Sequence, residues 1–205
     1  MPPTPLPENA VHPKTRAQWR RWLERNHSRP EGVWVVMERA GTTSNNATMA
    51  YDAAVEEALC WGWIDSRRRG LDDQRSLLWM APRKPRTGWS RSNKLRVARL
   101  SAEGRMAPPG LAKVRAAKRD GSWTLLDAVE ALEVPGDLAR SLAASRGRGY
   151  FDAFPPSVKK QLLEWVRCAK KQETHDKRVA EIARLAAMNI RANQWMKKPQ
   201  DATSR

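Results

Sequence analysis

The stretch that decides the fold is Cys60-Trp61-Gly62-Trp63-Ile64-Asp65-Ser66, which continues directly into Arg67-Arg68-Arg69. Apolar and aromatic residues in a short run are typical of a β-strand. Period-two alternation from Cys60 onward would place Trp61, Trp63 and Asp65 on one face of this strand. We therefore expect a buried strand that ends beside one carboxylate and a rim of guanidinium groups able to bind anions.

Two further segments predict strands. Residues 33–37 are rich in β-branched and aromatic side chains and follow a glycine. Residues 76–80 follow the turn residues 70–73 and precede Pro82, so they predict the returning strand of a hairpin. Residues 1–13 are rich in proline and predict an extended lead-in.

Helical periodicity predicts the elements that cover this sheet. A helix over residues 49–59, capped by Thr48, would leave Glu56 and Glu57 off its apolar stripe. A second helix over residues 93–103 would turn three apolar side chains inward, namely Leu95, Ala98 and Ala102. Other helices are expected from Lys14, over residues 108–119, and after the caps Ser157 and Thr174, the last two forming a helical hairpin.

The predicted fold class is therefore α+β. A small antiparallel sheet of about three strands packs with helices and is followed by a C-terminal helical hairpin. The expected divisions are an extended lead-in over residues 1–13, an α+β core domain over 14–133, a helical domain over 134–192 and a flexible basic tail over 193–205.

The charge of the chain points to anionic partners. Among 205 residues, 38 are lysine or arginine and 22 are acidic, which gives a net charge of +16. Residues 66–119 hold 16 of the basic residues against three acids. Such a surface attracts nucleic acid, anionic lipid or acidic protein. Two cysteines are too few for a disulfide framework, and no apolar run of about 18 residues or signal peptide is present, so we expect a cytoplasmic protein.

Arg83 is the strongest candidate for binding a ligand. It follows Pro82 at a strand end, close in sequence to the helix start Trp89-Ser90-x-x-Asn93, whose free amides favour anions. A structural clamp is an equally good interpretation of Arg83. The full set of candidate ligand-binding residues is Trp63, Asp65, Arg67, Arg83, Trp89 and Asn93.

Several of these residues also have a structural interpretation, which we favour for the tryptophans. Trp61, Trp63 and Trp79 would fill the core rather than stack on a ligand. Asp65 would pair with Arg67 or Arg83, or accept from a turn amide. The three histidines lack metal-ligand spacing, and no catalytic set stands out, so we expect no metal and no cofactor, and we favour a protein that is not an enzyme.

Nucleic-acid binding is an alternative hypothesis. Phosphate contacts from the arginine-rich region 66–119 would supply the affinity without reading sequence. The candidate residues for this role are Arg68, Arg69, Lys94, Arg96 and Arg99.

Two series of motifs resemble a known family. The first is Tyr51-x-x-Ala54-Val55-Glu56-Glu57-Ala58-Leu59-Cys60-Trp61-Gly62-Trp63-Ile64-Asp65-Ser66, then Ala81-Pro82-Arg83-Lys84, Trp89-Ser90-x-x-Asn93 and Glu103-Gly104-Arg105-Met106. The second runs from Val134-Pro135-x-Asp137-Leu138 through Phe154, Ser157 and Trp165 to Ala169-Lys170 and Glu173-Thr174. Together they resemble the YdeI/OmpD-associated, or bacteriocin-protection, family over most of residues 13–190.

This resemblance implies a role in resistance to bacteriocins or to envelope stress. Where the family usually carries an arginine after the Glu-Thr pair, this chain has His175. We expect a cytoplasmic stress-protection or antimicrobial-resistance protein that acts by binding a small anionic ligand or a polyanion. An enzyme or sensor for a small anionic ligand, held between Trp63, Arg83 and Asn93, is a further alternative.

Overall fold

The structure, a computed structural model, describes residues 5–38 and 49–193 and consists of two units. The first unit ends at Leu125 and the second begins at Leu126. The division expected after residue 133 leaves the short helix α5 (Asp127–Glu130) in the first domain, whereas in the structure α5 contacts α8 (Pro156–Arg167) of the second unit. The predicted α+β class is confirmed.

The first unit is built around a four-stranded sheet in the order β1-β2-β4-β3. β4 pairs antiparallel with both of its neighbours, and β1 pairs parallel with β2, so the sheet is mixed. The expected three strands are present, and the additional strand β1 has only two residues, too few to show a period-two pattern. The strands are β1 (Ala10–Val11), β2 (Val33–Glu38), β3 (Trp63–Gly70) and β4 (Arg75–Pro82).

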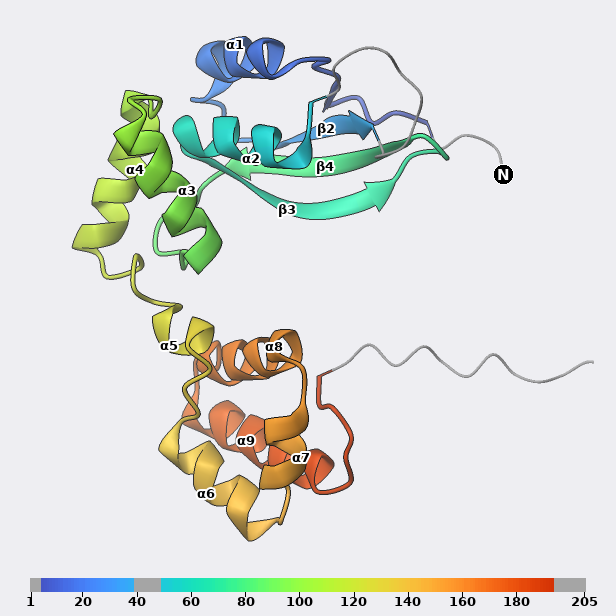
Figure 1. The fold of residues 1–205 in the computed structure, drawn as a ribbon, viewed down its shortest axis with the longest axis vertical. Coiled ribbons are helices and arrows are strands. Elements are labelled where there is room, and N and C mark those ends of the chain that lie inside the picture. The colour runs from blue at the N-terminus through green and yellow to red at the C-terminus, as the bar shows by residue number, and fades with distance from the viewer. Residues whose placement is uncertain (1–4, 39–48, 194–205) are drawn as a thin grey trace, which may run out of the picture. The chain divides into compact units, whose positions relative to one another are not determined.

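The two faces of this sheet have different surroundings. Val35 lies opposite Leu78, and both are buried in the main core together with side chains of α1 (Arg16–Asn26) and α2 (Tyr51–Cys60). Figure 1 shows these two helices over one face of the sheet. Trp34 lies opposite Trp79, and because side chains alternate along a strand, this pair points to the other face.

The stretch expected to be a strand from Cys60 onward begins as helix. Cys60 is the last residue of α2, Trp61 is its C-cap, and β3 begins only at Trp63. Gly62 has φ of +78°, a conformation that ends helices and is open to glycine at little cost. The predicted alternation that grouped Trp61 with Trp63 is therefore wrong, because the helix and its glycine end occupy its first three positions.

The helix α2 carries two glutamates that the prediction placed off its apolar stripe. Glu56 and Glu57 are in fact buried, with only 6% and 1% of their surface exposed. Four arginines explain this burial, since a buried charge is tolerated when it is paired. They are Arg16, Arg20, Arg99 and Arg105.

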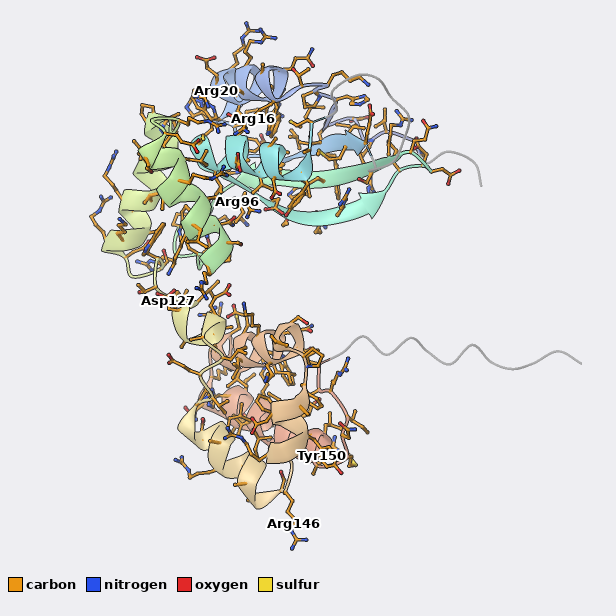
Figure 2. All side chains as sticks on the ribbon, in the orientation of Figure 1. Arg16, Arg20, Arg96, Asp127, Arg146 and Tyr150 are labelled. Atoms are coloured by element: carbon orange, nitrogen blue, oxygen red, sulfur yellow. The ribbon has the colours of Figure 1, made fainter. Side chains whose placement is uncertain are left out.

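Glu57 has the closest set of partners. Its carboxylate accepts from Arg16 Nε at 2.6 Å, Arg20 Nη1 at 2.8 Å and Arg105 Nη2 at 2.7 Å. Figure 2 shows Arg16 and Arg20 between α1 and α2. Glu56 accepts from Arg16 Nη2 at 2.8 Å and from Arg99 of α3 (Arg91–Ala102). The predicted cap Thr48 lies outside the described residues, and Ala50 is the N-cap of α2.

The inward face predicted for the next helix is wrong. In α3, Leu95 is 63% exposed and Ala98 and Ala102 are also exposed, whereas Val97 and Leu100 are buried. The buried stripe begins at Asn93, a polar residue, so hydrophobic periodicity missed it. Ser90 is the N-cap, and its hydroxyl accepts from the amide of Asn93.

The helix α4 (Pro108–Arg119) has the bounds that the sequence predicts. Its residue Gly110 lies against the end of α2, where an added Cβ would be 2.2 Å from the carbonyl oxygen of Cys60. The amide of Ala107 donates to the same oxygen at 3.1 Å. A side chain at residue 110 would therefore force the two helices apart.

The second unit is helical. Its buried side chains include Leu138, Leu142, Phe151, Leu162 and Ile182. The caps predicted at Ser157 and Thr174 are wrong, because the helices begin at Pro156 and Gln172, with a proline at the first position of the former. The expected hairpin is part of a larger set: α5, α6 (Gly136–Ala144), α7 (Arg148–Ala153), α8 and α9 (Gln172–Ala186).

The expected flexible basic tail over 193–205 falls almost entirely on residues outside this description. Within the described ranges, no helix has the length and apolarity needed to cross a membrane.

Replacing Glu57 with glutamine should destabilise the first unit strongly. The amide keeps the shape but removes the charge that three arginines share, and breaking a buried ion pair from one side costs about 3 kcal/mol. Urea unfolding measures the change. Asp52→Asn is the matched control, because Asp52 pairs with Arg96 but is 69% exposed, so its loss should cost less than about 1 kcal/mol. Equal costs for both variants would contradict this account.

Asp137 should make the second unit sensitive to acid. Its Oδ2 lies 2.5 Å from His175 Nε2, and its Oδ1 accepts from the amide of Leu138. The bond with His175, followed by that from Leu138, holds the pKa of the Asp137 carboxyl below its ordinary value. The carboxylate therefore stabilises the unit above the ordinary pKa of about 3.9, and this contribution is lost as the pH falls through the lowered pKa.

We expect Asp137→Asn to lower the free energy of unfolding at pH 7 by less than about 1 kcal/mol, since the pair is partly exposed. The wild-type and variant unfolding curves should converge as the pH falls below 3.9. A constant difference down to pH 2 would show that the charge of Asp137 does not contribute.

Candidate anion site at the end of the sheet

Arg83 occupies the position where β4 leaves the sheet. Its amide donates to the carbonyl oxygen of Gly62 at 2.9 Å, which fixes the backbone beside the start of β3. Its guanidinium carbon lies 3.7 Å from the centroid of the Trp89 ring, so the two flat groups are in direct contact. Only 3% of Arg83 and 2% of Trp89 are exposed.

The guanidinium of Arg83 is only partly satisfied. Nη2 donates to the carbonyl oxygen of Gly88 and, at 3.5 Å, to that of Thr87. Nε and Nη1 are buried and have no hydrogen-bond partner among the described residues, and no carboxylate there lies within 4.0 Å. A buried, unpaired charge is costly, so these donors point to an anionic partner.

Burial also changes the acidity of Arg83. Desolvation disfavours the charged form and lowers the pKa of the guanidinium to about 10. The group is still a cation at neutral pH, so it carries a positive charge in a site with little water to screen it.

Two hollows border Arg83. The larger has a volume of about 430 Å³ and is also lined by Trp79, Lys84 and Lys113. The smaller, of about 80 Å³, is also lined by Trp89 and by residues of α4 and of the segment after it. Arg83, Lys84 and Lys113 line both hollows, so three cationic side chains converge at this end of the sheet.

One acidic residue, Asp120, also lines the smaller hollow. Its carboxylate accepts from the hydroxyl of Ser122 at 2.6 Å and from the amide of that residue at 2.9 Å. These bonds, the hydroxyl first, lower the pKa of Asp120. Asp120 is thus held by its own turn.

Two of the other predicted ligand residues are structural. Trp63 is fully buried, and its Nε1 donates to the carbonyl oxygen of His27 at 3.0 Å. Asp65 accepts from the hydroxyl of Tyr51 at 2.7 Å, so the predicted pairing with an arginine is wrong. Burial, and then this bond, raise the pKa of Tyr51 to about 12. The tyrosine is the first residue of α2.

The remaining predicted residues divide between two places. Trp89 contacts Arg83 directly, whereas Arg67 lies over Trp34 and Trp79 on the sheet. Asn93 is buried at the start of α3, and its Oδ1 accepts from Arg96 at 3.2 Å. Of the six candidates, the smaller hollow brings together Arg83 and Trp89. Lys84 and Lys113 were not predicted as site residues, and the only sequence signal for Lys113 was its place on a basic helix.

The five residues expected to bind nucleic acid also differ in their partners. Arg96 pairs with Asp52 at 2.6 Å and Arg99 pairs with Glu56, so both are neutralised on the helices. The other three contact aromatic or hydroxyl groups: Lys94 lies over Trp123, Arg68 donates to the hydroxyl of Ser76, and Arg69 lies over Trp34.

The described residues contain no cluster of three or more histidine, cysteine or acidic side chains that could hold a metal ion. Burial raises the pKa of the Cys60 thiol to about 11, so this residue is protonated at neutral pH.

Two family models match the chain. The model described as Domain of unknown function (DUF8412) matches residues 11–113, and the model described as Bacteriocin-protection, YdeI or OmpD-Associated matches residues 131–189. The chain therefore belongs to the DUF8412 family, whose model spans half of it, and its second unit contains a YdeI/OmpD-associated, bacteriocin-protection domain. The expected family is thus confirmed for residues 131–189, whereas the resembling motifs at 51–106 lie in the part that DUF8412 matches. No curated protein and no solved structure showed a significant match.

Replacing Arg83 with methionine tests whether the arginine is a clamp or a ligand site. Methionine fills similar space, removes the desolvation penalty and loses the bond to Gly88, and these effects should offset each other. We expect the free energy of unfolding to change by less than about 1 kcal/mol, as measured with urea. A loss of about 3 kcal/mol or more would show that Arg83 is a structural clamp.

Proposed function

We propose that the protein has a bacteriocin-protection-type function and performs it by binding an anionic ligand at Arg83, Lys84 and Lys113. The family match of the second unit supports the general role. The binding step is supported by one observation above all: the buried guanidinium of Arg83 has two nitrogen atoms without partners.

Oxyanions such as phosphate are the ligands that this arrangement suits best. Arginine offers several N–H donors in one plane, and charge-assisted bonds to phosphate or carboxylate are stronger than neutral ones. Contact with Trp89 holds the guanidinium plane in place before a ligand arrives. Lys84 and Lys113 border the same hollow and would neutralise further negative charge.

We propose binding rather than catalysis. Arg83, Lys84 and Lys113 supply cationic donors that suit the binding of an anion, and the Cys60 thiol is buried with a raised pKa. The cytoplasmic location expected from the sequence stays a prediction. Both cysteines are free thiols, which suits a reducing compartment.

Titration with inorganic pyrophosphate, phosphate and sulfate tests the binding site. A ligand that binds only the folded state raises its stability, by about 2.7 kcal/mol at a concentration 100 times Kd, so the Tm of the first unit should rise with pyrophosphate. Calorimetric titration gives the Kd. Arg83→Met should abolish both signals, because it removes the buried donors.

Arg25→Met is the matched control, since Arg25 is exposed on α1 and its loss removes the same charge. It should leave pyrophosphate binding nearly unchanged. If the two variants bind pyrophosphate equally well, the site is not at Arg83.

A further inference from the structure

The face of the sheet opposite α1 and α2 carries a pair of tryptophans. Trp34 of β2 lies directly across from Trp79 of β4, with ring centroids 5.1 Å apart and planes at 67°. Both side chains are only partly buried, and beside them Val36, Leu71 and Leu77 form a small apolar cluster. Within residues 5–38 and 49–125, no helix lies over this face (Figure 1).

Two arginines of β3 lie over these rings. The guanidinium of Arg67 is 5.6 Å from the Trp34 ring and 5.5 Å from the Trp79 ring, and that of Arg69 is 4.5 Å from Trp34. Both arginines are exposed, and no carboxylate of the described chain pairs with either. The aromatic surface therefore carries positive charge that nothing in the described unit neutralises.

The arginines near α2 in the same unit are, by contrast, paired with carboxylates. Arg16, Arg20, Arg99 and Arg105 share the buried carboxylates of Glu56 and Glu57, and Arg96 pairs with Asp52. These arginines therefore have carboxylate partners within the described unit, whereas Arg67 and Arg69 do not. On the sheet face, Trp79 also lines the hollow that Lys84 and Lys113 border, which extends the cationic surface along the sheet.

We propose that the surface formed by Trp34, Trp79, Arg67 and Arg69, here called the tryptophan face, binds single-stranded nucleic acid. Indole rings offer flat surfaces on which unpaired bases stack, and exposed guanidinium groups bind backbone phosphates. A duplex keeps its bases stacked inside, so only a single strand can use both kinds of contact. This inference goes beyond the anion site, because its four residues do not include Arg83.

Fluorescence anisotropy with a labelled 20-nucleotide oligo(dT), in the full chain at low salt, measures this binding. We expect the observed affinity to fall linearly with salt on logarithmic axes, and the matching duplex to bind more weakly than the single strand. No binding of oligo(dT) at low salt, or equal affinity for the duplex, would overturn the proposal.

Two variants separate stacking from charge. Trp34→Leu should weaken oligo(dT) binding by about tenfold and leave the salt slope unchanged, because it removes a stacking surface but no cation. Arg67→Gln with Arg69→Gln should reduce the salt slope by about 1 to 2, since each lost phosphate contact lowers it by about 1. The double variant alters only exposed side chains, so it remains informative if Trp34→Leu disturbs the small apolar cluster.

The control is Arg21→Gln with Arg25→Gln, which removes two exposed charges from α1 on the other side of the sheet. If this pair weakens binding as much as the Arg67 and Arg69 pair, the affinity comes from net charge alone and the tryptophan face is not the site. Pyrophosphate titration of Trp34→Leu distinguishes the two proposals. If this variant loses oligo(dT) binding but still binds pyrophosphate, the loss concerns the tryptophan face and not the anion site.

Discussion

The first unit depends on the ion pairs that Glu57 makes inside it. One carboxylate, almost fully buried in α2, binds arginines from α1 and from the segment after α3. Its neighbour Glu56 adds α3 through Arg99. The two carboxylates are buried where three helices meet. Because each carboxylate must be paired with arginines, these ion pairs determine how the helices pack on the sheet.

Arginine serves two opposite purposes in this unit. Around α2, arginines are paired with carboxylates, and the bond to Glu57 raises the pKa of Arg20. Arg67, Arg69 and Arg83 instead lie against indole rings, and burial lowers the pKa of Arg83. A paired guanidinium has used its charge within the fold, whereas a stacked one is held in position and still has donors to offer. The net charge of +16 does not distinguish the paired arginines from the stacked ones.

The sequence predicted the elements better than it predicted their faces. The strands near residues 33 and 76 and the helix over 108–119 follow from periodicity and turn residues, and they are present. Two of the wrongly predicted helix faces contain buried polar residues: Glu56 and Glu57 in α2, and Asn93 in α3. Hydrophobic periodicity has no means of detecting buried polar positions, and the arginines of α1 that pair with Glu56 and Glu57 lie more than 35 residues away along the chain.

The candidate site, too, could be predicted from the sequence only in part. Arg83 was predictable from a strand end followed by a helix start, but its contact with Trp89 and its lack of a carboxylate partner depend on how the loop between them folds. Asp65 was assigned to an arginine because arginines are its neighbours in sequence, yet its partner is Tyr51 of α2. Lys113 joins the site only because α4 packs against the end of α2.

The packing of α4 against the end of α2 also affects what it costs to bind a ligand. Gly110 brings the backbone of α4 against the carbonyl oxygen of Cys60, and Lys113 follows one helical turn later, where its Cγ would be 2.8 Å from a Cβ on Gly62. Backbone against backbone leaves little room for α4 to slide or tilt. The wall of the hollow that carries Lys113 is therefore already in place in the free protein, so an anion arriving there would lose its own freedom of motion without also having to order the helix.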